Sequence, residues 1–139
     1  MKVLYLETSS MLAWLFNETS AAEVLKMINR ADLIVTSELL KIEGMRIIHR
    51  NLKEKLLTEY QHDELLDYFY PNLKSWFVMS IDEAVVERAS EPFPVEPVRS
   101  LDAIHLATAM EYKKLYPQLE VTSQDKRILD NIDPLGLSS

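Results

Sequence analysis

The chain has 139 residues, of which 47% are hydrophobic and 27% are charged, and this composition predicts a single globular domain over residues 1–139. Acidic residues outnumber lysine and arginine by 22 to 15, and the net charge of −7 argues against a generally basic surface for polyanions. The absence of cysteine excludes disulfides, thiolate metal sites and a cysteine nucleophile, and two distant glycines cannot form a glycine-rich phosphate-binding loop.

Short apolar segments predict four β-strands. Val3–Leu6 is an unbroken apolar run, which is typical of a strand buried on both faces of a parallel sheet. Three further segments have a similar length and composition: Leu33–Thr36, Trp76–Met79 and Leu119–Thr122. The C-terminal residues 135–139 are too few to decide whether a fifth strand follows.

Predicted helices alternate with these strands. Polar caps and apolar periodicity indicate six helices and a seventh, short one that begins at Asp125. The six cover approximately the ranges 11–16, 20–30, 37–51, 54–70, 82–89 and 100–115. The alternation predicts an α/β fold, a three-layer sandwich with a mostly parallel sheet of four to five strands.

Two details of the helices follow from the positions of proline and of the apolar residues. Pro71 is expected to end the helix over 54–70, and three prolines make residues 91–99 a non-helical connection. In the helix that begins near residue 100, a set of residues at helical spacing is expected to face the core: Leu101, Ile104, Thr108 and Leu115.

The N-terminal segment gives no sign of export or membrane insertion. No apolar run approaches the roughly 20 residues of a membrane span. Glu7 interrupts the first apolar run before the core of a signal peptide could develop. We therefore expect a cytoplasmic protein with no membrane partner.

Four acidic residues stand where carboxylates are unusual. Glu7 follows the first predicted strand and Asp125 follows the last, at the edge of a parallel sheet where ligands bind. Glu43 lies in mid-helix among apolar residues, and Asp102 lies in the first turn of a core-facing helix. Three of them also have ordinary explanations: Asp125 as a helix cap, Asp102 as a partner of the helix dipole, and Glu43 as an ion pair with Arg46.

The four acids lie in the segments LYLETS (4–9), TSELLKIE (36–43), LDAIHLATA (101–109) and VTSQDK (121–126). In this order the segments resemble PIN-domain ribonucleases, most closely the small VapC-type toxins of toxin–antitoxin pairs. The similarity extends to about Leu129, and the third segment is its most specific part. The resemblance implies the parallel PIN sheet, a metal-dependent endoribonuclease that hydrolyses RNA phosphodiesters, and an antitoxin partner.

The resemblance also implies an acidic site, both catalytic and metal-binding. It would consist of Glu7, Glu43, Asp102 and Asp125, with the Ser9 hydroxyl beside the first acid. The residue types agree with this chemistry, because clustered carboxylates repel one another and need a counter-charge. Oxygen ligands without cysteine favour Mg²⁺ or Mn²⁺ over Zn²⁺, and these ions activate water and stabilise charge on a phosphodiester.

One position departs from the family pattern. The first acid of the family is normally aspartate, whereas this chain has Glu7, whose extra methylene moves the carboxylate by about 1.5 Å. Since Mg²⁺ requires nearly fixed distances, the alternative to an active ribonuclease is a catalytically degenerate PIN-like module that still binds antitoxin or RNA. A phosphoryl-accepting receiver-like domain is disfavoured, because no acidic pair follows the first strand.

The positions of three further groups of residues favour particular roles. The basic stretch containing Arg46, Arg50 and Lys53 is either a solvated helix face or a strip that contacts RNA phosphates. The aromatic residues of the segment 68–77 are expected to lie mostly in the core, with a dimer surface as the alternative; the resemblance itself implies a homodimer. The three histidines lack the spacing of zinc ligands, and His105 is expected to be a packed, hydrogen-bonded core residue.

Overall fold

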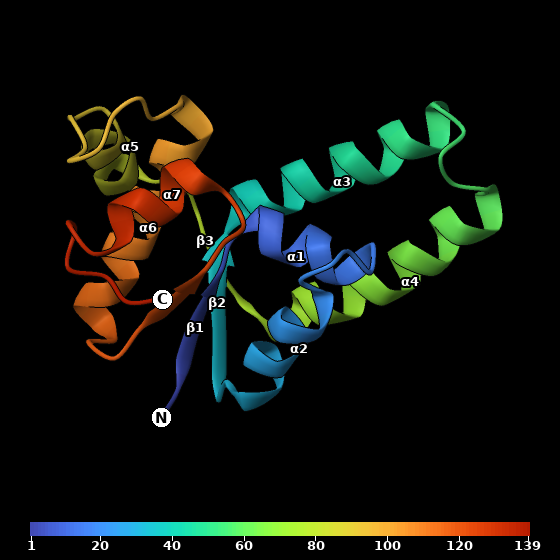
Figure 1. Ribbon diagram of the computed structural model, residues 1–139, viewed down its shortest axis with the longest axis horizontal. Coiled ribbons are helices and arrows are strands. Elements are labelled where there is room, and N and C mark those ends of the chain that lie inside the picture. The colour runs from blue at the N-terminus through green and yellow to red at the C-terminus, as the bar shows by residue number, and fades with distance from the viewer.

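The computed structural model describes residues 1–139 and contains one sheet of four parallel strands (Figure 1). The strands are β1 (Val3–Leu6), β2 (Leu33–Ser37), β3 (Phe77–Met79) and β4 (Glu120–Thr122). Their order across the sheet is β3-β2-β1-β4, and in the register Tyr5 lies beside both Val35 and Val121. All four strands predicted from the sequence are confirmed. The C-terminal tail adds only an isolated parallel bridge between Ser138 and Glu120.

Seven helices cover the two faces of this sheet. They are α1 (Thr8–Leu15), α2 (Ala21–Arg30), α3 (Glu38–Lys53), α4 (Glu59–Ser75), α5 (Glu83–Ala89), α6 (Ser100–Leu115) and α7 (Lys126–Ile132). Figure 1 shows α5, α6 and α7 on one side of the sheet and α1 to α4 on the other. The three-layer α/β fold predicted from the alternation of elements is therefore confirmed. None of the helices is long and apolar enough to cross a membrane.

Each face of the sheet has its own hydrophobic core. Val3 and Tyr5 of β1 belong to one cluster, together with Leu106 of α6 and Ile128 of α7. Leu6 points the other way and packs in a second cluster with residues of α1 to α4. This division follows from the alternation of side chains along a strand, which sends successive residues to opposite faces.

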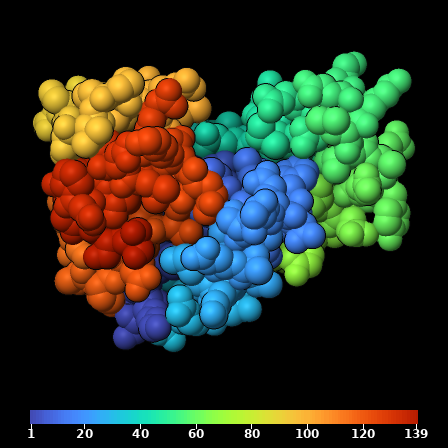
Figure 2. All heavy atoms as spheres, viewed as in Figure 1, coloured from blue at the N-terminus to red at the C-terminus, as the bar shows by residue number.

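Helices α3 and α4 form an arm that projects from the rest of the molecule (Figure 2). Gly44 allows α3 to approach its neighbours, because a Cβ at this position would lie 2.8 Å from Met11 Cε and 3.1 Å from Phe69 Cζ. Both of these side chains are fully buried. The N-terminus of α4 is closed by a capping box between Thr58 and Gln61.

The prediction that a helix ends at Pro71 is wrong, because α4 continues to Ser75. A proline inside a helix removes one backbone N–H and displaces the preceding turn. Here the Asn72 side chain donates a 2.8 Å hydrogen bond to the Tyr68 carbonyl oxygen in the turn that precedes the proline. Burial of Phe69 and Trp76 on either side of the proline further favours the continued helix.

The predicted core-facing side of α6 is also partly wrong. Leu101 and Leu115 are 48% and 65% exposed, whereas Thr108 is buried as expected. The buried side of the helix instead includes Asp102 and His105. Apolar residues occur almost all around this helix, so their spacing alone did not determine which side would be buried.

Candidate acidic site

Three of the four predicted acids lie at helix N-termini. Glu7 ends β1 and caps α1, Asp102 lies in the first turn of α6, and Asp125 follows β4 and caps α7. Short polar side chains are favoured at such caps because they accept hydrogen bonds from otherwise unpaired backbone N–H groups. Asp125 shows this directly, since its Oδ1 accepts a 2.9 Å hydrogen bond from the Arg127 N–H.

Glu7 is buried, with 4% of its surface exposed, and its carboxylate is held by three donors. The Ser9 backbone N–H donates to Oε2 over 2.9 Å, and the hydroxyls of Ser9 and Ser123 both donate to Oε1. Neighbouring residues therefore compensate the buried Glu7 carboxylate with hydrogen-bond donors. The donors stabilise the charged carboxylate and fix its orientation.

Ser123 connects Glu7 to Asp125. While its hydroxyl donates to Glu7, the same oxygen accepts a 3.0 Å hydrogen bond from the Asp125 N–H. Sequence reasoning did not assign a role to Ser123, although a hydroxyl directly after a buried strand and two residues before an acid was an available signal. It joins the end of β1 to the loop between β4 and α7.

Glu43 enters the site from α3 and is bound by two residues from other elements. Its Oε1 accepts a 2.6 Å hydrogen bond from the Thr8 hydroxyl and lies 2.8 Å from His105 Nε2. The alternative of an ion pair with Arg46 is not formed. The partly buried position of this acid in mid-helix is thus explained by a polar partner on α1 and another on α6.

Asp102 and Asp125 form the less compensated part of the site. Burial raises the pKa of Asp102 above its ordinary value, and repulsion from the Asp125 carboxylate raises it further. The charge of Glu7 adds a smaller increase, while a hydrogen bond from the Arg99 N–H acts in the opposite direction. The fold therefore brings the carboxylates of Glu7, Asp102 and Asp125 close enough for their charges to interact.

These side chains do not form a ready-made cage for a metal ion. No group of three histidine, aspartate or glutamate side chains is arranged to hold one. The chemistry of the donors nevertheless suits a hard divalent cation, because they are carboxylate and hydroxyl oxygens and the acids repel one another. The charges that act on Asp102 are those of Asp125 and Glu7, so these three acids are the candidates to share one ion.

The other sequence-based candidates lie outside this cluster. Arg46, Arg50 and Lys53 are exposed along α3, starting one turn beyond Glu43 and continuing outward along the arm. His105 is 2% exposed and hydrogen-bonded, as its interpretation as a core residue requires. Of the aromatic residues in segment 68–77, Phe69 and Trp76 are buried, but the expected burial is wrong for three exposed members: Tyr68, Tyr70 and Phe77.

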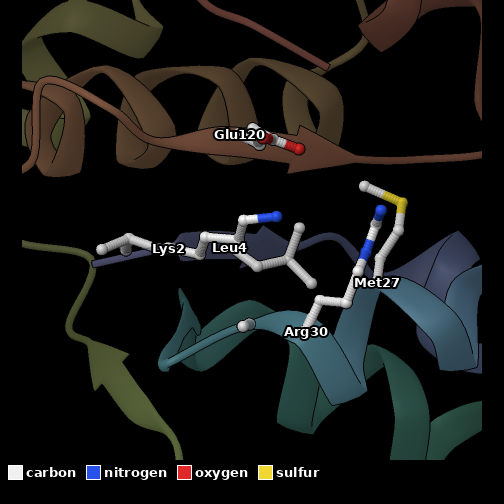
Figure 3. Close-up of a pocket in the computed structure, with 7 residues that line it drawn as sticks. Lys2, Leu4, Met27, Arg30 and Glu120 are labelled. Atoms are coloured by element: carbon white, nitrogen blue, oxygen red, sulfur yellow. The ribbon is translucent and has the colours of Figure 1, made fainter.

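A small cavity near the other end of the sheet carries none of the predicted site residues (Figure 3). It lies where β1 begins and α2 ends, with Lys2, Arg30 and Glu120 contributing charges of both signs. Its mixed charge and position distinguish it from the acidic cluster at the carboxyl ends of the strands.

The family model for the PIN domain matches residues 4–133. The protein belongs to the PIN domain family. This assignment confirms the resemblance to PIN domains inferred from the four sequence segments, and the matched range includes all four acids. No curated protein matches the chain.

Two solved structures show the same PIN fold. A toxin–antitoxin complex from Klebsiella pneumoniae aligns with a TM-score of 0.65 and 16% identity over 98% of this chain and 96% of the other. VapBC2 from Rickettsia felis, bound to a DNA fragment from its promoter, aligns with a TM-score of 0.65 and 12% identity over the same fractions. At these identities the two comparisons establish the fold.

Proposed function

We propose that this PIN domain is a Mg²⁺- or Mn²⁺-dependent endoribonuclease and the VapC-type toxin of a toxin–antitoxin pair. The observation that supports this most directly is the pairing of Asp102 with Asp125, where burial and then repulsion from Asp125 raise the pKa of Asp102. Acids that destabilise one another at a ligand-binding edge are expected where a bound cation compensates them. The PIN family match supports the same conclusion.

In this proposal Asp102, Asp125 and Glu7 hold the divalent ion, and Glu43 completes the acidic site. When bound, the ion supplies positive charge that compensates the acids and the phosphodiester and lowers the pKa of a coordinated water. The role of Ser9 and Ser123 is to keep the Glu7 carboxylate oriented through their hydroxyl donors. Hydrolysis itself adds water across one P–O bond and needs no other co-substrate.

The substrate strand is proposed to lie along the arm. Arg46, Arg50 and Lys53 are exposed on α3, and the first of them is only three residues from Glu43. In a protein with a net charge of −7, a local basic strip attracts the phosphates that the acidic site alone would repel. Neutralising these residues should raise KM for RNA more than it lowers kcat.

Cleavage of total RNA tests the proposed activity. The parent protein should cleave RNA with Mn²⁺ or Mg²⁺ and lose cleavage in EDTA, and Asp102→Asn should lose it while remaining folded by circular dichroism. Equal cleavage by the parent and Asp102→Asn in the same preparation would trace the activity to a contaminant or to another site.

A non-catalytic binding module is the second candidate, and Glu7 is the observation that favours it. This residue replaces the usual aspartate of the family, and its carboxylate already accepts hydrogen bonds from Ser9 and Ser123. A protein of this kind would be silent in the RNA assay and still bind its antitoxin. The exchange Glu7→Asp distinguishes the two functions, because it restores cleavage only if Glu7 is a degenerate ligand.

The proposed partners are a cognate antitoxin and a second copy of the chain. An antitoxin is supported by the two similar structures, which are both toxin–antitoxin complexes by description or name. A homodimer is supported by exposed aromatic residues, of which Tyr68 and Phe77 are 56% and 60% exposed. Light scattering that gives only the 16.1 kDa monomer at micromolar concentration would contradict the homodimer.

A further inference from the structure

His105 is a buried histidine whose two ring nitrogens are both hydrogen-bonded. Its Nδ1 lies 2.8 Å from the Tyr5 hydroxyl, and its Nε2 lies 2.8 Å from Glu43 Oε1. Nε2 also lies 3.0 Å from the Thr8 hydroxyl oxygen, but 3.9 Å from the nearest Glu7 oxygen. The ring therefore contacts one of the four acids directly and is only near a second.

The partners of His105 define which nitrogen carries hydrogen. The Thr8 hydroxyl donates its single hydrogen to Glu43, so Nε2 must carry a hydrogen to bond with either of these two oxygens. Tyr5 carries a hydroxyl hydrogen at neutral pH, as tyrosine ordinarily does. Its hydroxyl can therefore donate to Nδ1, which leaves a defined orientation of the ring with Nε2–H directed at Glu43.

This arrangement ties together two elements that carry acids. His105 lies three residues after Asp102 on α6, so both side chains share a face of that helix. Glu43 belongs to α3, and 62 residues separate it from His105. A hydrogen bond from His105 to Glu43 therefore fixes the Glu43 carboxylate relative to the helix that presents Asp102.

We propose that His105 is a positioning residue for the acidic site, which orients Glu43 through Nε2–H while Tyr5 holds the imidazole from its other nitrogen. This role rests on the proposed ribonuclease function and adds to it a residue that neither contacts the substrate nor binds the ion. If His105 served only to fill the core, the N–H that it directs at Glu43 would have no role. The two roles make different predictions for substitutions that retain or move the donor.

Two polar substitutions separate these roles. In His105→Gln the side-chain amide N–H occupies roughly the position of Nε2 and still reaches Glu43, whereas in His105→Asn the shorter side chain does not. Both replacements remove the ring from the same buried site, so both should lower the melting temperature. Matched substitutions at His62, which is also buried but bonds to His49 and Asp63 in the arm, provide the control.

The expected results concern cation affinity and turnover. His105→Gln should stay within about threefold of the parent in Mn²⁺ affinity and kcat, and His105→Asn should lose about 10- to 100-fold in both, as is typical when a residue that orients a ligand is removed. KM for RNA should remain unchanged, because His105 does not face the basic strip. Equal losses in the two variants, or retention by both, would overturn the positioning role.

Crystal structures of the two variants test the proposal without cation or RNA. The Glu43 carboxylate should remain bonded to residue 105 in His105→Gln and should turn away from α6 in His105→Asn. An unmoved Glu43 in His105→Asn would refute the positioning role, whatever the protein does to RNA. Conversely, a displaced Glu43 in a protein whose parent cleaves no RNA would contradict the ribonuclease and leave the positioning of Glu43 established.

Discussion

The two halves of the acidic site differ in how their charges are compensated. Glu7 and Glu43 accept hydrogen bonds from hydroxyl groups and from the Ser9 N–H, and Glu43 also contacts His105. Asp102 and Asp125 each accept a hydrogen bond from a backbone N–H, and burial, followed by repulsion from Asp125, raises the pKa of Asp102. One half is therefore held in place by the protein, and the other retains repulsion that a cation would relieve.

The largest effect is expected from removing the charge of the less compensated half. The double variant Asp102→Asn, Asp125→Asn should reduce RNA cleavage by at least about 100-fold, since loss of even indirect ligand partners costs 10- to 100-fold. Mn²⁺ should raise the melting temperature of the parent by binding its folded state, and should raise that of the variant much less.

Asp82→Asn is the matched control for this experiment. Asp82 caps α5 in the same way that Asp125 caps α7, and asparagine also serves well as an N-cap. This exchange should leave both cleavage and the Mn²⁺ effect unchanged. A stabilisation by Mn²⁺ as large in the double variant as in the parent would show that the ion binds elsewhere.

Substitutions of Glu7 test whether the half of the site that contains Glu7 and Glu43 is adapted to a longer acid. Glu7→Gln should abolish cleavage, because it keeps the shape and removes the charge, and Glu7→Asp should cleave no better than the parent. A nearly silent parent that gains cleavage in Glu7→Asp would identify a degenerate site. The cleavage rates of the parent and the two variants, with folding checked by circular dichroism, distinguish an adapted site from a degenerate one. Equal rates in all three proteins would exclude Glu7 from the site.

The position of Glu43 also depends on the close packing of its neighbour on α3, Gly44. Gly44→Ala adds a methyl group 2.8 Å from Met11 and 3.1 Å from Phe69, which are both fully buried. Overpacking of this kind costs about 1–3 kcal/mol, and the higher helix propensity of alanine returns at most about 1 kcal/mol.

Urea denaturation of Gly44→Ala should therefore give a lower free energy of unfolding than the parent. Ile47→Ala, a truncation at a partly buried position on the same helix, shows how far an ordinary loss of packing on α3 lowers the free energy of unfolding. A variant as stable as the parent would mean that Met11 and Phe69 move aside without cost.

The smallest effect is expected from the pH dependence of stability. Because the pKa of Asp102 is raised in the folded protein, protonation of this group favours the folded state. This stabilisation of the folded state is fully present below the pKa that Asp102 has in the unfolded chain. It is lost as the pH rises through the higher pKa that Asp102 has in the folded protein.

Comparison with Asp102→Asn isolates this contribution from that of the other acids. The stability of the parent relative to the variant should increase as the pH is lowered from 7 through the raised pKa of Asp102, measured by thermal unfolding without divalent ions. A difference that stays constant with pH would indicate that Asp102 titrates alike in both states.

The sequence determined the strands because their signal is local. Val3–Leu6 is a continuous apolar run, and the alternation of such runs with capped helices is sufficient to predict parallel strands between helical layers. Asp125 was likewise recognisable as a helix cap from its neighbours alone. The order of the four segments indicated the PIN family, which the family model confirms over residues 4–133.

Tertiary structure decided which groups face each acid. Ser123 donates to Glu7 across 116 residues of sequence, and His105 bonds to Glu43 across 62. It also decided that Leu101 lies at the surface and that α4 continues through Pro71. Apolar periodicity and residue preferences report the backbone within a few residues, whereas hydrogen bonds between distant side chains and the choice of a buried face depend on how the layers pack.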